Sequence, residues 1–284
     1  MLGALGFSLK AIFVKAAYCY GVDPETLLAL RMLYALPLFL LLGAQAARTA
    51  PAALTAADWR ALVLLGFLGY FASSYLDFLG LRHISAALER LILYVYPTIV
   101  VLYAAWQERR APTPTMMRAL LLCYAGVALA VAHDLHAGGA QVWLGGLLIF
   151  ASAIVYAIYL LRAAPVLTRV GSARFTAWAT SAACLFAIAL FLAQRPVAAL
   201  YTQPWQVQAL SAAMAVFSTV LPIWLFSEAI RRLGAGPTAV IGSLGPVITM
   251  LLAWQLLGES LGVLQVLGAA LVIYGVRIVA VARA

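Results

Sequence analysis

Charged residues are scarce in this chain of 284 residues, at 10% of the sequence, while hydrophobic residues make up 66%. A soluble globular domain carries about 25% charged and about 45–50% apolar residues. This shortage, together with a mean hydropathy of +1.03, excludes a soluble enzyme, a disordered chain and a nucleic-acid-binding protein. Acidic residues are rarest: nine Asp and Glu face eighteen Lys and Arg, a net charge of +9. No soluble surface is left to hold a basic patch, so the excess is a signal of membrane topology.

The chain has few cysteines and none of the common enzyme motifs that we searched for. Cys19, Cys123 and Cys184 lie in separate apolar stretches, too few and too scattered for a disulfide framework or a metal site. The chain has no Gly-rich phosphate loop, no His-Glu-x-x-His and no nucleophile elbow. We therefore expect no enzymatic activity and neither a cofactor nor a metal ion.

Long apolar runs fill the rest of the chain. A membrane-spanning helix needs about 20 apolar residues, and nine polar breaks leave ten such runs. The runs lack the alternation of outer-membrane strands, so we predict an all-α membrane protein with ten transmembrane helices. The first run is counted as a genuine span because neither a basic leader nor a cleavage motif accompanies it. The predicted spans are residues 2–20, 24–44, 60–81, 84–106, 114–132, 142–161, 172–193, 205–230, 236–257 and 260–281.

The arginines predict the orientation of these spans. With the first terminus in the cytoplasm, twelve cations fall in cytoplasmic segments, and only Arg82 and Arg195 fall in external loops. The positive-inside rule then places both termini in the cytoplasm of a bacterial inner (plasma) membrane. An odd number of helices would scramble this segregation. The twelve are Arg48, Arg60, Arg109, Arg110, Arg118, Arg162, Arg169, Arg174, Arg231, Arg232, Arg277 and Arg283.

Several spans begin with the residues that start helices. Asp23 before Pro24 is typical of an N-cap followed by proline at the first helical position. Thr113 before Pro114 repeats the pattern, and Asp58 is expected to cap the helix that follows it.

An internal repeat divides the chain into two units. In both copies a helix ends at a short basic turn, and a small-residue start leads into a helix with a proline. We predict five-helix units at residues 1–133 and 142–284, and because five is odd the second unit is inverted in the membrane. Inverted repeats are a recurrent architecture of secondary transporters, with the substrate site near the midplane between the halves. A shift of 149 residues aligns Arg82 with Arg231, Ala86 with Ala235, Pro97 with Pro246 and Ile99 with Ile248, and a shift of 143 aligns Phe7 with Phe150 and Arg31 with Arg174.

Residues at matching places of this repeat resemble a known family. The first stretch is residues 84–97, and the second runs from Gly245-Pro246-Val247 to Leu257-Gly258-Glu259-Ser260-Leu261, followed by Gln265 and Gly268. With Lys15 followed by Arg31, they are similar to the EamA branch of the drug/metabolite transporter superfamily. The resemblance covers essentially the whole chain and implies two inverted EamA units that carry small metabolites, often in export. Gln107-Glu108-Arg109 departs from the Leu-Gly-Glu of the second unit, so the turn after the fourth helix is expected to differ.

Ionisable residues inside the spans are the strongest candidates for a site, because each costs roughly 2.5–3.5 kcal/mol at the bilayer centre. They can form an ion-paired structural cluster, snorkel to the interface, or line a hydrated cavity. In the cavity reading, Lys15 and Arg31 attract a carboxylate, and Glu89 pairs with them or carries a proton. Asp77, Glu89 and Glu228 are the gate or coupling candidates. The whole set is Lys10, Lys15, Arg31, Asp77, Glu89, Arg90 and Glu228.

Deep aromatic residues and prolines complete the candidate site. Pro97 and Pro246 are predicted hinges on which the halves rock, with plain packing kinks as the alternative. The aromatic residues either pack in the core or line a pocket for an aromatic or amphipathic solute. They are Tyr34, Tyr75, Tyr94, Tyr96 and Trp224.

The sequence thus predicts a secondary-active transporter that exports small polar metabolites such as amino acids. It would work by alternating access around a central cavity, coupled to protons or by facilitated exchange. A channel-like pore and an intramembrane enzyme are the alternatives. The expected partners are a small-molecule solute and the lipid bilayer, without nucleic acid, and the chain is expected to be a monomer or a homodimer.

Overall fold

The computed structural model describes residues 2–48, 53–107, 109, 114–138, 140–223, 225 and 245–281. Every regular element within these ranges is a helix, so the predicted all-α class is confirmed. Six helices of the described chain are long and apolar enough to cross a membrane, and two shorter apolar helices follow them. The protein is therefore an integral membrane protein. The six are Pro24–Arg48, Ala56–Leu81, Met117–Asp134, Gln141–Val170, Ser172–Gln194 and Trp205–Ile223, and the shorter two are Gly245–Leu257 and Val263–Gly275.

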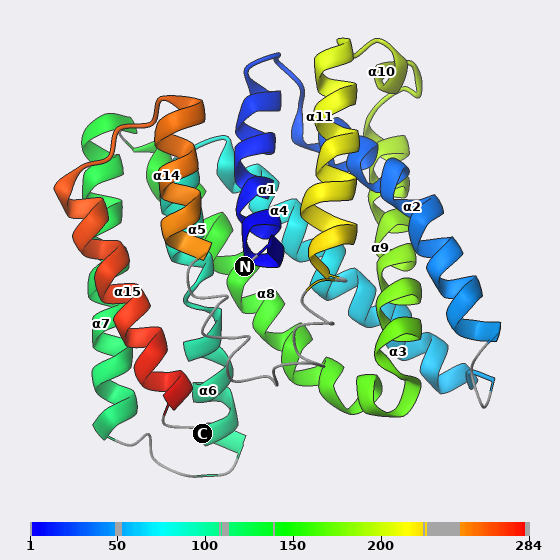
Figure 1. The fold of residues 1–284 in the computed structure, drawn as a ribbon, viewed down its shortest axis with the longest axis horizontal. Helices are drawn as coiled ribbons and strands as arrows, with labels where there is room; N and C mark the ends of the chain where they lie inside the picture. Colours follow the sequence, from blue (N-terminus) through cyan, green and yellow to red (C-terminus); the bar gives the residue numbers. More distant parts are fainter. Residues whose placement is uncertain are drawn as a thin grey trace.

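The helices follow one another up and down the molecule (Figure 1). Two of the long helices contain a π-helical turn: η1 lies between α3 and α4, and η2 follows α11. The first half of the chain holds α1 (Leu2–Tyr18), α2 (Pro24–Arg48), α3 (Ala56–Gly66), η1 (Phe67–Ala72), α4 (Ser73–Leu81), α5 (Ala86–Leu93), α6 (Tyr96–Gln107) and α7 (Pro114–Gly138). The second half holds α8 (Gln141–Val170), α9 (Ser172–Gln194), α10 (Ala198–Tyr201), α11 (Trp205–Ala215), η2 (Val216–Val220), α14 (Gly245–Leu257) and α15 (Val263–Val281).

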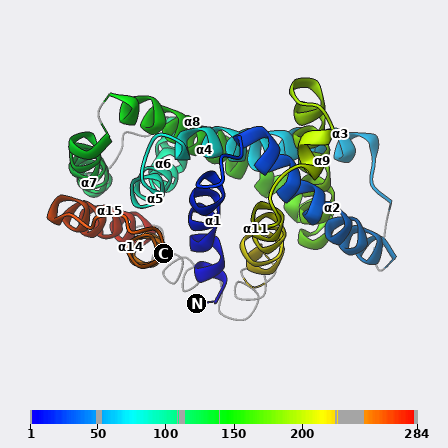
Figure 2. The same ribbon diagram turned by 90° about the horizontal axis from the view of Figure 1, so that it is seen from above.

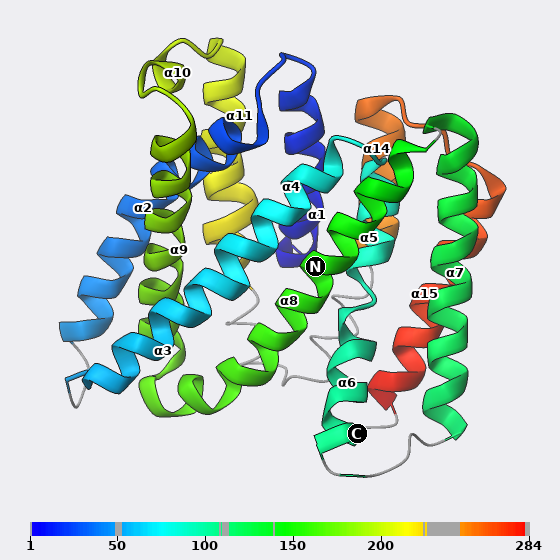
Figure 3. The same cartoon turned by 180° about the vertical axis from the view of Figure 1, so that it is seen from behind.

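The connections gather at two ends of the molecule. The α1–α2, α4–α5 and α14–α15 connections lie at the same end as α10 (Figures 1 and 3); this end is called the α10 end. The α2–α3 and α8–α9 connections lie at the opposite end. There, Arg169 of α8 forms an ion pair of 2.7 Å with Asp58 of α3. Seen from above, α1 lies between α11 and α14 (Figure 2), so the first helix contacts the second half of the chain on both sides.

Several predicted helix boundaries need correction. Asp58 does not cap its helix: Thr55 is the N-cap, and Asp58 is the partner in its capping box. The predicted span 84–106 is broken at Tyr94 and Val95, because Pro97 supplies no N–H to a continuous helix and disfavours helical backbone before it.

Two further boundaries concern the polar breaks at residues 162–172 and 107–114. The helix predicted at 142–161 continues through its polar turn and ends at Gly171, whose φ of +88° suits glycine. Pro114 begins α7 as expected, while Thr113 lies outside the described residues.

Asp23 caps α2 as predicted. Its two carboxylate oxygens accept hydrogen bonds from the N–H and the hydroxyl of Thr26, at 2.9 and 2.8 Å. Arg195, from the connection before α10, lies 3.6 Å from the same carboxylate. Burial alone would raise the pKa of Asp23, but these hydrogen bonds and the nearby Arg195 hold it below the ordinary value.

Replacing Asp23 by alanine is expected to lower the stability of the detergent-solubilised protein by about 1 kcal/mol at pH 7, because the cap is lost. Asp23→Asn is the matched control, since asparagine caps helices about as well as aspartate. A depressed folded-state pKa stabilises the fold above the unfolded-state value of about 4, and this contribution is lost as the pH falls below it. Thermal unfolding at pH 7 and pH 3 measures both effects. Equal midpoints for wild type and Asp23→Ala at pH 7 would contradict the prediction.

Candidate functional site

Four charged side chains from three helices of the first half form a buried network where α1 meets α4 and α5. Lys10 of α1 places its ammonium 2.7 Å from Asp77 of α4 and 3.4 Å from Glu89 of α5. Arg90, next to Glu89, lies 3.8 Å from the other Glu89 oxygen. Asp77 and Glu89 are 1% and 0% exposed. The formal charges of this Lys10 network (Lys10, Asp77, Glu89 and Arg90) cancel.

Arg90 makes its close contacts with other helices. Its Nε donates to the Thr249 hydroxyl of α14 at 3.2 Å, and its guanidinium also donates to the Phe7 carbonyl of α1. Glu89 is therefore left with two cations at distances beyond the roughly 2.7–2.9 Å of a strong charge-assisted hydrogen bond. Neither oxygen of Glu89 and neither oxygen of Asp77 has a hydrogen-bond partner within the described structure, so the two buried carboxylates rely on their ion contacts.

Arg31 occupies a separate buried position on α2. It is 6% exposed, its Nε donates to the Thr219 hydroxyl of η2 at 3.0 Å, and its guanidinium carbon lies 5.5 Å from the centre of the Phe78 ring. Its Nη1 has no hydrogen-bond partner in the part of the chain that the structure describes. No carboxylate of those residues lies within ion-pair distance of it. A buried cation without a counter-ion is costly, and is more often functional than structural.

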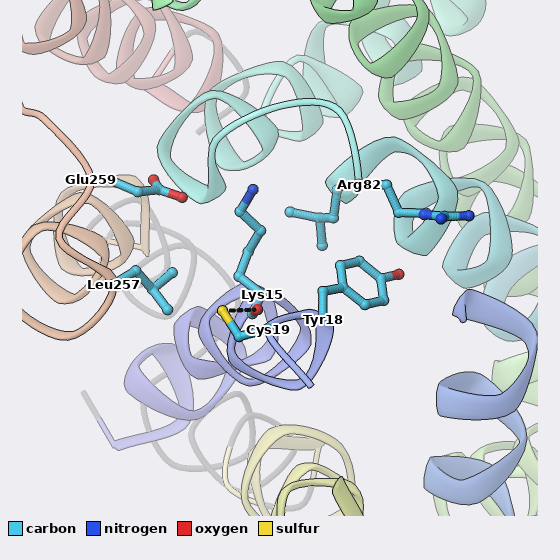
Figure 4. A pocket seen from close by; sticks show the side chains of 7 residues that line it. Lys15, Tyr18, Cys19, Arg82, Leu257 and Glu259 are labelled. Carbon is cyan, nitrogen blue, oxygen red and sulfur yellow. Dashed lines mark hydrogen bonds between the residues drawn. The ribbon is translucent and has the colours of Figure 1, made fainter. Parts of the chain in front are cut away.

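Lys15 shares none of these contacts and lines a cavity at the α10 end. Its ammonium donates to the Ile84 carbonyl at 2.9 Å, and it extends toward the side of the cavity that holds Glu259, whereas the Arg82 guanidinium points away (Figure 4). Lys15 and Arg31, which were predicted to attract one carboxylate together, therefore have different neighbours. The cavity has a volume of about 370 Å³ and is lined by Lys15, Tyr18, Cys19, Leu81, Arg82, Leu257 and Glu259.

Glu259, from the α14–α15 connection, closes one side of the cavity by capping α5. Its carboxylate accepts hydrogen bonds from the N–H of Ala86 at 2.9 and 3.1 Å and from that of Ala87 at 3.4 Å. Burial raises the pKa of Glu259 above its ordinary value, although these hydrogen bonds and the charge of Lys15 act in the opposite direction. Sequence reasoning noted Glu259 only within a family motif and did not assign it to a site.

Three further side chains complete the attachment of α5. Asp134 of α7 accepts from the Ser85 N–H at 3.0 Å, and Gln265 of α15 donates to Asp134 at 2.6 Å. Ser85 in turn accepts from the Leu88 N–H at 3.0 Å. Ser85, Asp134, Glu259 and Gln265 are called the α5 latch. It joins the start of α5 to three segments distant in sequence.

The predicted aromatic residues do not form a single pocket. Tyr34 is 38% exposed and donates to Gln208 at 2.8 Å. Tyr75 donates to Glu25 at 3.1 Å, close to the start of α2. Both hydroxyls therefore bind polar residues away from the Lys10 network.

Tyr94 and Tyr96 belong to a row of tyrosines that extends to α8 and η1. Ring centres are 6.3 Å apart between Tyr94 and Tyr96, 5.1 Å between Tyr96 and Tyr156, and 5.5 Å between Tyr156 and Tyr159. The Tyr159 hydroxyl donates to that of Tyr70 at 3.1 Å. Sequence reasoning missed Tyr70, Tyr156 and Tyr159. Tyr156 and Tyr159 lie one turn apart on α8, and Tyr70 lies in η1. The sequence does not indicate that these two elements bring the three rings together.

The two predicted hinge prolines lie at equivalent positions of their helices. Pro97 is the second residue of α6 and Pro246 the second residue of α14, at the start of a helix and not in its middle. Trp224 and Glu228 lie outside the residues whose side chains the structure describes.

Comparisons with known proteins give a consistent picture. The sequence model of the EamA-like transporter family matches residues 1–132 and again residues 143–281. The uncharacterized transporter YcbK of Bacillus subtilis (strain 168) is 33% identical over 277 residues, covering 94% of this chain and 87% of that protein. The uncharacterized transporter YyaM of the same organism is 28% identical, covering 75% and 70%. One crystal structure superimposes with a TM-score of 0.65 at 18% identity, covering 98% of this chain and 94% of the other, which shows a shared fold.

Proposed function

Because the chain belongs to the EamA-like transporter family, we propose that it is a secondary-active carrier that exports small polar metabolites such as amino acids. It alternates access to a cavity between two inverted five-helix units, residues 1–133 and 142–284. Pro97 and Pro246 act as hinges. The solute and the lipid bilayer are its partners.

The proposed repeat is supported by paired irregularities in the helices. The π-helical turns begin at Phe67 and Val216, and the proline helices begin at Tyr96 and Gly245. Both pairs are 149 residues apart, the shift that aligns Pro97 with Pro246. A π-helical turn is rare and is often found at functional sites, so two at equivalent places favour duplication over coincidence.

The packing of the helices supports the same symmetry. Exchanging the two units turns the α1–α11 contact into α8–α3, the α1–α14 contact into α8–α6, and the α2–α11 contact into α9–α3. All six contacts are present. Such an exchange is the expected signature of an inverted repeat about an axis in the membrane plane.

The proposed topology has ten spans, with the α10 end facing outward and both termini in the cytoplasm of a bacterial inner membrane. Each of the ten predicted spans contains at least one helix of the described chain. The connections that carry Arg82 and Arg195 lie together at the α10 end, where Arg195 pairs with Asp23 and Glu25. The positive-inside rule requires the external connections to carry few cations, and the connections at the α10 end fit this requirement.

One observation carries the proposed substrate class: Arg31 is buried, and the described residues provide neither a counter-ion for it nor a hydrogen-bond partner for its Nη1. A guanidinium is suited to hold a carboxylate through paired hydrogen bonds. Binding a carboxylate here would neutralise a charge that the described residues leave uncompensated. The Thr219 hydroxyl of η2 provides a polar group beside the guanidinium.

A counterflow assay in proteoliposomes tests the proposal. Vesicles are loaded with one unlabelled amino acid at a time and diluted into its radiolabelled form. We expect saturable counterflow for a subset of amino acids, and none for the matched amines that lack the carboxylate. Non-saturating flux would favour the channel-like alternative. Equal counterflow of an amino acid and its amine would contradict the assignment of the carboxylate to Arg31.

A further inference from the structure

The cavity at the α10 end has one cationic and one anionic group on facing sides. The Lys15 side chain extends toward the side that holds the Glu259 carboxylate (Figure 4). Within the described chain, neither group forms an ion pair with the other or with any third residue. Opposite charges that face one space without pairing match a ligand that carries both charges.

We propose that this cavity is a second amino-acid site, distinct from Arg31, for a zwitterion with an apolar side chain. Lys15 binds the carboxylate of the ligand, and Glu259 binds its ammonium group. The inference rests on the proposed function and deepens it by adding a site for the same solute class at the α10 end. The cavity volume of about 370 Å³ lies within the range of roughly 300–1,000 Å³ that is usual for small-molecule sites.

Lys15 has hydrogen-bonding capacity left for a carboxylate. An ammonium group has three N–H donors, and the described residues engage only one of them, through the Ile84 carbonyl at 2.9 Å. The side chain is partly buried, so its charge is screened less by solvent and salt than that of an exposed lysine. The remaining donors of Lys15 are therefore suited to hold the carboxylate of a ligand.

Glu259 can accept one more donor without leaving α5. A carboxylate offers about four lone-pair sites, and the N–H groups of Ala86 and Ala87 supply three hydrogen bonds. These backbone donors match the ionised carboxylate, which is an acceptor only. A ligand ammonium can therefore bind Glu259 while the α5 latch stays closed.

The rest of the cavity wall is mainly apolar and defines the side chain that fits. Leu81, Leu257 and the ring of Tyr18 line it. The Tyr18 hydroxyl is engaged, because it donates to the Phe78 carbonyl at 2.7 Å. The Arg82 guanidinium points away from the cavity (Figure 4). A third charge on the side chain of the ligand would have no partner here, so apolar amino acids are favoured over acidic and basic ones.

The site joins the two halves of the chain. Lys15 belongs to α1, and Glu259 belongs to the connection between α14 and α15, while α1 and α14 pack against each other. A ligand held by both groups favours the conformation in which they face one another. Occupancy of the cavity thus favours a closed α10 end.

Cys19 provides a binding assay that needs no transport. It is exposed and lines the cavity, whereas Cys123 and Cys184 are buried. In the detergent-solubilised protein, L-leucine at ten times its dissociation constant leaves about one cavity in eleven empty. We therefore expect it to slow maleimide labelling of Cys19 about tenfold, and Cys19→Ser identifies the labelled thiol.

Two analogues of leucine test recognition at both ends of the ligand. 3-Methylbutylamine lacks the carboxylate and 4-methylpentanoate lacks the ammonium group, and neither should protect Cys19 at the concentration used for leucine. Protection by either analogue equal to that by leucine overturns the two-point recognition. Labelling that leucine does not slow overturns the inference.

Variants assign the two contacts. Lys15→Gln and Glu259→Gln should each weaken protection by leucine at least about tenfold, because each removes a hydrogen bond between charged groups. Labelling rates with and without leucine are compared within each variant, which cancels changes in thiol reactivity. Arg195→Gln is the matched control: it removes a cation from the same end that pairs with Asp23 and Glu25 and does not line the cavity. Wild-type protection in Lys15→Gln or Glu259→Gln overturns the corresponding contact.

Counterflow separates this inference from the proposed function. Arg31→Gln should lose counterflow and keep the protection of Cys19 by leucine, because the two sites have no residue in common. Loss of protection in Arg31→Gln overturns the assignment of a separate site. Amino-acid counterflow without protection of Cys19 overturns the inference and leaves the proposed function intact. Protection of Cys19 without counterflow of any amino acid supports the site and contradicts the proposed function.

Discussion

Arg31→Gln is expected to reduce amino-acid counterflow at least about a hundredfold. Hydrogen bonds to a charged group contribute about 1.5–3 kcal/mol each, and 1.4 kcal/mol corresponds to a factor of ten, so the loss of two such bonds to a carboxylate is sufficient. Arg31→Lys keeps the charge but not the planar pair of donors, and an intermediate loss is expected.

The same substitution should leave the fold intact, which separates function from structure. Arg31 is buried without a carboxylate partner in the described chain, so glutamine removes an uncompensated charge and should maintain or raise the thermal midpoint. Arg169→Gln is the matched control. That side chain is 55% exposed and pairs with Asp58 at the opposite end from α10. Its loss should leave counterflow close to the wild-type rate. Wild-type counterflow in Arg31→Gln would contradict the proposed carboxylate site.

Most of the helical fold is predictable from hydropathy because one physical requirement dominates it. A backbone within the bilayer must satisfy its own hydrogen bonds, so apolar runs become helices. Local chemistry then locates some ends, as at Asp23 and Pro114. It fails where polar residues remain helical, as at Arg162 before Gly171, and where a proline breaks an otherwise apolar run at Tyr94.

The candidate site is only partly predictable for a different reason. Hydropathy identifies buried charges, and the structure brings Lys10, Asp77 and Glu89 together. Which charges meet depends on the rotation of each helix and on its neighbours, and these are tertiary properties. For that reason Lys15 and Arg31 could not be assigned to separate places from the sequence.

The α5 latch shows the same limit more clearly. Glu259 and Asp134 lie at polar breaks, where a solvated turn is the ordinary interpretation. Their role follows from the start of α5, whose first N–H groups have no partners within the helix and need acceptors from elsewhere. A sequence shows that such acceptors are required but not which distant carboxylate provides them.

Glu259→Ala is expected to open the α10 end. It leaves the N–H groups of Ala86 and Ala87 without their acceptor, and a buried unsatisfied donor costs about 1–3 kcal/mol. That cost falls on the state in which the α14–α15 connection rests on α5. The equilibrium between the closed and open α10 end should therefore shift by about tenfold or more toward the open state.

Thiol labelling measures this shift directly. Leu81 lines the cavity but is fully buried, so Leu81→Cys in a Cys19→Ser background provides a reporter, and Cys123 and Cys184 remain buried. Glu259→Ala should raise the rate of labelling by a membrane-impermeant maleimide, applied outside intact cells, by about tenfold. Glu259→Gln retains an acceptor and should have a smaller effect, and Ser260→Ala, in the same connection, should have none. Equal labelling of the Glu259→Ala variant and its parent would show that the latch does not hold this end closed. Labelling that occurs only from the cytoplasmic side would instead reverse the proposed orientation, since the α10 end would then face inward.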